Sequence, residues 1–389
     1  MPLTISDERS VRYAWIAWAL LFVATAAIIA SGSVRTVVPA YREGAVSWVT
    51  GFIIYHHIGV GGFPYFPQAA ILFIPFSLLP VTAGEVVWRL VNIAVFSAGI
   101  FRFAGFARAG SGKEFFPLMT LVSLPLAWSC ARNGQATLAM TGLMLLAVIA
   151  VAEQRWWRAT LWLLLGVSVK PLMIVLLLLI MAIDRPMSWR VAVGLLITAL
   201  VPFLTQHPGY VLEQYAACWK HFTTAAHVGA TESGWTSPFH ALRLVGAAIP
   251  ESVQTVIRLA AALGTLALCW LSRRRHDAVR SAVFVFSFSV AYVLLFSPRT
   301  ENNTYAMLGP AISVFLAGAY LAEKRHREGL LIGGIVLVIL GSRLIERLLT
   351  PNAGTNWVSP LMAVCFTAYL MARFFRERRI PEGHGQHIH

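Results

Sequence analysis

Few carboxylates in this sequence can act as a general base, and most belong to glutamate. Aspartate occurs only as Asp7, Asp184 and Asp277, and the charge pattern described below places all three on the cytoplasmic side. A base on the opposite face must therefore be a glutamate, because a carboxylate within hydrogen-bond reach can take a proton from a hydroxyl group. The candidate catalytic residues are Glu43, Glu301 and Glu232.

A lysine stands between two very apolar segments at Lys170, directly before the helix-breaking Pro171. Burying an unpaired ammonium group is costly, so Lys170 either reaches the outer interface or binds an anion such as a lipid phosphate. Arginine meets phosphate oxygens with two parallel donors, whereas lysine acts as a point charge. The cations expected to surround a negatively charged headgroup are Lys170, Arg132, Arg299 and Arg42.

Two short polar stretches interrupt the apolar segments. Arg132–Gln135 is a short turn, and Ser297–Tyr305 is a dense run of hydrogen-bonding side chains. The second stretch is either a tight turn or part of a site. His56–His57 has no ligand partner at i+4, and the four cysteines show neither CxxC nor metal spacing. We expect no metal-binding residues and no cofactor, while a requirement for a divalent metal stays open.

The elements that must position these residues are membrane helices. Of the 389 residues, 58% are hydrophobic and 12% charged, whereas soluble domains carry about 25% charged residues. The apolar runs are 13–31, 83–104, 115–131, 136–152, 158–169, 171–183, 189–205, 253–271, 279–296, 304–322, 328–348 and 357–376. The sequence therefore predicts an all-α polytopic membrane protein with about twelve transmembrane helices, forming one integral membrane domain over residues 1–389.

The basic residues indicate the orientation. A net charge of +14 would suggest nucleic-acid binding in a soluble protein. Here most of the 31 lysines and arginines fall in the turns that share one side with both termini. By the positive-inside rule this pattern predicts a multi-pass protein of the bacterial cytoplasmic (inner) membrane. Both termini are expected in the cytoplasm, with membrane lipids as partners, no nucleic acid, and a monomeric state.

Two long segments are expected on the extracytoplasmic side, residues 32–82 and 206–252. In the first loop, Pro67–Pro80 is too short to cross easily, at about 1.5 Å per residue against roughly 30 Å. It is expected as an interfacial or re-entrant helix, and Pro39–Gly51 as an interfacial helix. Aromatic residues of the second loop either stack on a sugar or isoprenoid or form a membrane-interface belt. The polar tail, 377–389, is expected to be a disordered cytoplasmic segment.

Several of these residues occur along the sequence in an order that is typical of a known protein family. The residues of the first-loop pattern are Tyr41, Gly51, Tyr55, the stretch Phe63–Gln68, Pro75 and Pro80. This pattern resembles the first loop of glycosyltransferase family 87. Asn133–Gly134–Gln135, Lys170–Pro171 and Ser297–Pro298, then Tyr305 and Pro310, look like later markers of that family. The resemblance covers roughly residues 30–320.

The resemblance implies a membrane glycosyltransferase of the GT-C superfamily. It further implies a polyprenyl-phosphate sugar donor, usually a mannosyl phospholipid, and transfer of a hexose to a lipid or glycan acceptor on the extracytoplasmic face. A lysine near a split helix pair would face the lipid phosphate. With the aromatic second loop included, the residues expected to contact acceptor or sugar are Tyr41, Tyr65, Gln68, Asn133, Gln135, Trp235, Asn302 and Tyr305.

The sequence departs from the family pattern at one place. Family members usually carry an aspartate a few residues before the tyrosine matched by Tyr41, where this chain reads Val37–Val38–Pro39–Ala40. Either Glu43, about one helical turn away, replaces it, or another glutamate such as Glu301 or Glu232 does, or this member of the family has lost or altered its activity. Glu43 is the first choice. In the expected reaction a glutamate deprotonates the acceptor hydroxyl, which attacks the anomeric carbon with inversion. Cations stabilise the leaving phosphate in place of a general acid.

Two other functions are compatible with the same residues. A transporter or flippase of a lipid-linked sugar would share the broken helix at Lys170–Pro171, but transporters often repeat such a break in their second half, and no matching pair is found there. A glycan ligase using a polyprenyl-pyrophosphate donor would share the ring of cations.

Overall fold

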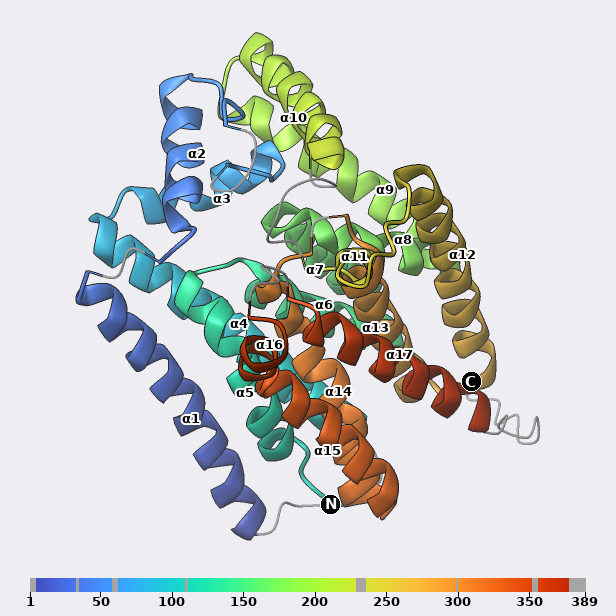
Figure 1. The fold of residues 1–389 in the computed structure, drawn as a ribbon. Coiled ribbons are helices and arrows are strands. Elements are labelled where there is room, and N and C mark those ends of the chain that lie inside the picture. The colour runs from blue at the N-terminus through green and yellow to red at the C-terminus, as the bar shows by residue number, and fades with distance from the viewer. Residues whose placement is uncertain are drawn as a thin grey trace, which may run out of the picture.

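The computed structural model describes residues 5–32, 35–57, 62–108, 111–228, 236–298, 300–351 and 356–377. These residues form helices and connecting turns, with no strand among them (Figure 1). The helices are α1 (Ile5–Ala30), α2 (Val38–Thr50), α3 (Pro67–Ser77), α4 (Val81–Ala107), α5 (Phe116–Asn133), α6 (Thr137–Ala152), α7 (Trp156–Val169), η1 (Pro171–Met173), α8 (Ile174–Ile183), α9 (Arg185–Leu200), η2 (Val201–Leu204), α10 (Pro208–Val228), α11 (Pro238–Arg243), α12 (Glu251–Arg275), α13 (Ala278–Phe296), η3 (Asn302–Met307), α14 (Leu308–Ala317), η4 (Gly318–Ala322), α15 (His326–Leu340), α16 (Ser342–Leu349) and α17 (Val358–Arg376).

Every apolar run of the sequence is helical, as expected of a chain that must satisfy its backbone hydrogen bonds within a bilayer. Seven helices in the described part of the chain are long and apolar enough to cross a membrane, and the bent pair α15–α16 raises this number to eight. The remaining runs are covered by α5, α6, α7 and α8, which are shorter or less apolar. The protein is therefore an all-α polytopic membrane protein, and the number of crossings stays a prediction.

Two of the expected helices are less regular than their sequences suggest. The run 328–348 bends by 64° between α15 and α16, where Gly341 separates the two helices. The run 304–322 begins as the 3-10 helix η3 and ends as the π-helix η4. Hydrophobicity alone does not reveal either feature, because both depend on how the backbone hydrogen bonds are shared locally.

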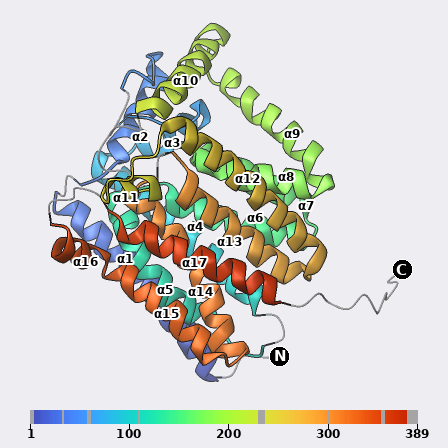
Figure 2. The ribbon, with the colours of Figure 1, turned by 45° about the vertical axis from the view of Figure 1, so that its right-hand side comes forward.

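The helices divide into a central and a peripheral group. In α13 and in the span from η3 to η4, 78% of the most apolar window is buried, against 11% in α12. Helix α12 packs on α13 and turns its apolar side chains outward, and Figure 2 shows it on the outer face of the bundle. In a bilayer, such outward apolar surface faces lipid chains.

Helices α4 and α6 approach so closely that glycine is required at their crossing. A Cβ atom at Gly99 would lie 2.8 Å from the Cα of Gly142, and one at Gly142 would lie 2.9 Å from the Cα of Phe96. Small residues commonly permit such contacts between membrane helices.

We expect Gly142→Ala to lower the free energy of unfolding by about 1–3 kcal/mol, because the backbones must move apart. Unfolding of the purified protein in detergent measures this loss. Gly264→Ala on α12 is the matched control, since its Cβ would meet no atom within 4 Å. Equal stability of the two variants would contradict the close crossing.

A second, smaller core covers one end of the helix bundle. Its buried residues come from α2, residues 54–55, residues 63–65, α3 and α10, and they pack on Trp88 and Ala136. Figure 1 shows α2, α3 and α10 together at this end, away from the first turn of α1 and the last turn of α17. The two predicted loops therefore meet over one end of the membrane helices, and the polar residues described next lie beneath them.

Candidate functional site

Lys170 lies at a break between two helices. Helix α7 ends at Val169, Lys170 has an extended backbone (φ −154°, ψ 125°), and η1 begins at Pro171. The side chain is 9% exposed, and its Nζ donates to Thr137 Oγ1 (2.8 Å) and Gln135 Oε1 (3.2 Å). No carboxylate among the described residues pairs with it. An ammonium group has three donors, so one donor remains for a ligand.

Gln135 connects Lys170 to a glutamate that is distant in the sequence. Lysine can only donate, so the Gln135 carbonyl must face Lys170 and its amide nitrogen must face away. That nitrogen donates to Glu301 Oε2. The half-buried Glu301 also caps η3, where its side chain accepts from the backbone N–H of Thr304. Lys170, Gln135 and Glu301, with Thr137, form a continuous chain of hydrogen bonds, which we call the Lys170–Glu301 cluster.

Two tyrosines of the first loop reach the same place. The hydroxyl groups of Tyr41 and Tyr65 lie 2.9 Å apart, and the Tyr41 hydroxyl accepts a hydrogen bond from the backbone N–H of Ala136 (3.3 Å). Burial raises the pKa of both phenols. Both therefore stay protonated and serve as hydrogen-bonding groups rather than as bases.

A small aromatic pocket lies beside the cluster. Its volume is about 30 Å³, and its walls include residues directly adjacent to Gln135 and Lys170 in the sequence. The lining residues are Tyr41, Phe63, Tyr65, Ala69, Leu72, Phe73, Trp88, Ala136 and Val169. A pocket of this size holds only a few water molecules. Its aromatic faces and phenol hydroxyls, rather than its volume, suit contact with a partly polar ligand.

The turn between α5 and α6 presents both Gln135 and a cation. Helix α5 ends at Asn133 with Gly134 in the left-handed conformation (φ +67°), which favours glycine. On the same turn, Arg132 Nε is buried without a hydrogen-bond partner, and no ion pair joins its guanidinium group to another described residue. The Nε donor of Arg132 is thus available to an anion.

The first-choice base, Glu43, lies elsewhere on the first loop. It is on α2, two residues after the buried Tyr41, and positions two apart on a helix point in nearly opposite directions. Its side chain is 60% exposed and lies 3.0 Å from His56 Nε2. The neighbouring Arg42 donates to the carbonyl of Leu79 (3.0 Å) and so connects α2 to the turn between α3 and α4.

The remaining predicted residues take several positions. Gln68 donates to Tyr215 Oη (2.6 Å), and this bond joins the first and second predicted loops. Gln68 also donates to the Thr198 carbonyl of α9 (3.0 Å). Asn133 precedes Gly134, and Asn302 directly follows Glu301, whereas Tyr305 donates to the Thr236 carbonyl (3.2 Å). Glu232, Trp235 and Arg299 lie outside the described residues.

Three residues near the cluster were not selected by sequence reasoning. Thr137 supplies the shortest hydrogen bond to Lys170. Trp88 and Arg89 on α4 donate to the turn that carries Gln135. The sequence alone could have indicated Arg89, because Glu85 and Arg89 stand four residues apart in an apolar helix and such a pair forms a salt bridge on one helix face. In the structure this salt bridge is 2.9 Å long.

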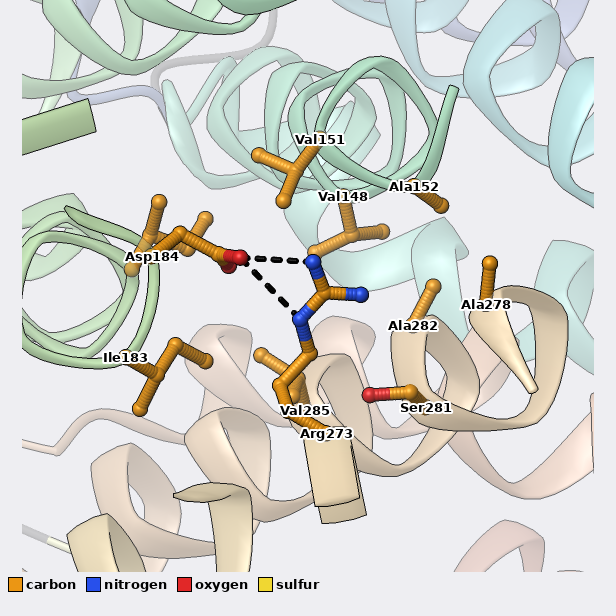
Figure 3. A pocket seen from close by; sticks show the side chains of 11 residues that line it. Val148, Val151, Ala152, Ile183, Asp184, Arg273, Ala278, Ser281, Ala282 and Val285 are labelled. Carbon is orange, nitrogen blue, oxygen red and sulfur yellow. Dashed lines mark hydrogen bonds and ion pairs between the residues drawn. The ribbon is translucent and has the colours of Figure 1, made fainter. Parts of the chain in front are cut away.

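Another polar site lies between α6, α8, α12 and α13. Arg273 donates to Asp184 Oδ1 through Nε (3.1 Å) and Nη2 (2.6 Å), as Figure 3 shows. The adjoining cavity is about 10 Å³, and Asp184 Oδ2 and Ser281 Oγ are buried without a described hydrogen-bond partner. A cavity of this size holds about one water molecule. The ion pair between Arg273 and Asp184 therefore holds helices together and does not form a substrate site.

The described residues contain no cluster of three or more histidine, cysteine, aspartate or glutamate side chains able to hold a metal ion. The three described polar groups with the strongest claim to chemistry, Lys170, Gln135 and Glu301, instead pair a cation and a carboxylate through an amide. Such an arrangement can bind an anion at one end and accept a proton at the other.

The sequence matches a known protein family. The sequence model of glycosyltransferase family 87 matches residues 63–298, which is more than half of the 389 residues. The matched segment contains Tyr65, Gln135 and Lys170, while Tyr41 lies 22 residues before its start and Glu301 lies three residues after its end. No curated protein matches the chain significantly. The match confirms the resemblance seen in the sequence, and the chain belongs to glycosyltransferase family 87.

Proposed function

We propose that this glycosyltransferase moves a hexose, with mannose as the expected sugar, from a polyprenyl-phosphate donor to a lipid or glycan acceptor. The observation that carries the proposal is the buried Lys170, which has neutral partners and a donor to spare at a helix break. A buried ammonium group without a carboxylate partner suits an anionic ligand. Arg132, on the neighbouring turn, supplies a second cation for the same phosphate.

Glu301 is the proposed base. It is linked to Lys170 through Gln135, so a donor phosphate at Lys170 places its sugar on the side of Glu301. The Glu301 carboxylate takes the proton of the acceptor hydroxyl, whose oxygen attacks the anomeric carbon. The bond between that carbon and the phosphate oxygen breaks, and the electron pair leaves with the polyprenyl phosphate. Attack from the opposite face inverts the anomeric configuration.

Lys170 and Arg132 act on the leaving group. Charge grows on the phosphate as the bond breaks, and fixed cations in a site shielded from water stabilise that charge without reorganising. No general acid is then required. Tyr41 and Tyr65, as protonated phenols in the wall of the aromatic pocket, are proposed to contact the sugar or the acceptor.

The extracytoplasmic face and the bacterial cytoplasmic membrane are part of the proposal. Their support is the charge pattern of the sequence, in which the basic turns lie with the termini. The end of the bundle that carries the cluster lies away from the start of α1 and the end of α17 (Figure 1).

A donor comparison in proteoliposomes tests the proposed substrate class. We expect label to move from polyprenyl-phosphate [³H]mannose to an acceptor in a membrane-lipid extract, with no transfer from a nucleotide-linked mannose. Empty liposomes serve as the control. Transfer from the nucleotide sugar alone would overturn the donor assignment. Label that crosses the bilayer without forming a product would instead identify a flippase.

A further inference from the structure

The turn that carries Gln135 is held at three successive carbonyl groups. Arg89 donates to the Arg132 carbonyl through Nη2 (2.9 Å) and Nε (3.3 Å). The backbone N–H of Val37 donates to the Asn133 carbonyl (3.0 Å), and Trp88 Nε1 donates to the Gly134 carbonyl (2.8 Å). A helix end normally leaves its last carbonyls without helical partners, and here neighbouring residues of α4 and the segment before α2 satisfy them.

Burying the charged side chain of Arg89 beside this turn costs free energy. Its side chain is completely buried, and its charge is paired with Glu85 at 2.9 Å. Replacing a buried ion pair by apolar residues is often neutral or stabilising, so such a pair is weak evidence for a role in stability alone. The geometry that only arginine supplies is its planar fork, which here reaches Glu85, the Arg132 carbonyl and Thr36 Oγ1 (3.0 Å) at once.

The packing leaves the turn little freedom. A Cβ atom at Gly134 would lie 3.1 Å from Arg89 Cζ and would also overlap Val38. Gln135 follows Gly134 directly, and its side chain is 4% exposed with both ends bonded to the Lys170–Glu301 cluster. A small shift of the turn would therefore change the distance between the cation and the carboxylate through Gln135.

We propose that Arg89, assisted by Trp88, is a positioning residue of the transferase that fixes Gln135 between Lys170 and Glu301. The inference rests on the proposed function of that cluster. Because the Arg89 side chain is completely buried, it would act through the turn rather than by touching a substrate. Misplacement of reacting groups by about 1 Å can reduce a rate by about 100-fold, so a fully buried guanidinium that sets one turn can affect turnover strongly.

The experiment compares Arg89→Lys and Trp88→Phe with matched controls in the polyprenyl-phosphate [³H]mannose assay. Lysine keeps the charge opposite Glu85 but loses the fork, and phenylalanine keeps the ring but loses the indole N–H. Trp48→Phe removes a similar indole bond, to Thr205 Oγ1, in the same small core. Arg373→Lys alters another buried arginine, which binds Glu323 and Glu328 far along the chain.

We expect kcat to fall about 100-fold in Arg89→Lys and about 10-fold in Trp88→Phe. The KM for the donor should change less than kcat does, because Lys170 remains and Arg132 is displaced with its turn without losing its charge. Both controls should stay within about twofold of wild type. Hydrogen–deuterium exchange should rise at residues 132–137 and stay unchanged in α13. Loss of turnover no greater than in the controls would overturn the proposal, as would faster exchange throughout the protein.

A double-mutant cycle separates positioning from general support. If Arg89 acts through Gln135, then Arg89→Lys combined with Gln135→Ala should be no slower than Gln135→Ala alone. If the double variant instead loses the product of the two single losses in kcat, the inference is overturned and Arg89 is a structural residue. Lys170→Ala is included in the same assay, because unchanged turnover in that variant would contradict the proposed function itself, whatever Arg89 does.

Discussion

Lys170→Ala is expected to reduce transfer from a polyprenyl-phosphate hexose by at least about 100-fold. The substitution removes the buried ammonium group whose free donor is proposed to meet the phosphate. Removing one preorganised donor from a developing anion typically reduces turnover by about 100- to 1,000-fold. The KM for the donor should rise as well, because the same charge contributes to binding before the reaction.

Initial rates over a range of donor concentrations measure this effect. Lys113→Ala is the control, since Lys113 is exposed in the turn between α4 and α5. Lys170→Arg is expected to recover part of the activity, because it restores the charge in a different shape. If Lys170→Ala kept the kcat and KM of wild type, the phosphate would have to bind elsewhere.

Glu301→Gln is expected to reduce kcat by about 100- to 10,000-fold while donor binding remains. Glutamine has nearly the same shape and can still accept from Gln135 or Thr304, but it cannot take the proton of the acceptor hydroxyl. Loss of a general base typically has this magnitude. Binding of radiolabelled polyprenyl phosphate to the purified variant, measured beside single-turnover transfer, separates the two effects. Weakened binding with unchanged single-turnover transfer would assign Glu301 to the donor site instead.

The helices and their main break were predictable from the sequence because they follow from composition and local geometry. Apolar runs of this length must be helical in a bilayer, and each one is helical here. Pro171 after Lys170 predicted two short helices, and the structure ends α7 at Val169. The bend at Gly341 was not predictable, because glycine occurs in many straight membrane helices and packing decides which one bends.

The contacts among the candidate site residues were harder to predict than the residues themselves. Gln135 and Glu301 are 166 residues apart, and no spacing rule connects residues so distant in a single sequence. Proximity to Tyr41 along the chain favoured Glu43, but the helical direction of α2 turns Glu43 outward. The contacts of Arg89 with the turn at Arg132 depend equally on the packing of α4 against α5.

The most direct measurement compares Glu301→Gln with Glu43→Gln in proteoliposomes supplied with polyprenyl-phosphate [³H]mannose and a membrane-lipid extract. If the reaction takes place at the Lys170–Glu301 cluster, Glu301→Gln loses at least about 99% of the transferred label. Glu43→Gln should keep the rate of wild type, because its side chain is exposed and faces His56. Transfer that survives in Glu301→Gln and disappears in Glu43→Gln would contradict this placement of the reaction.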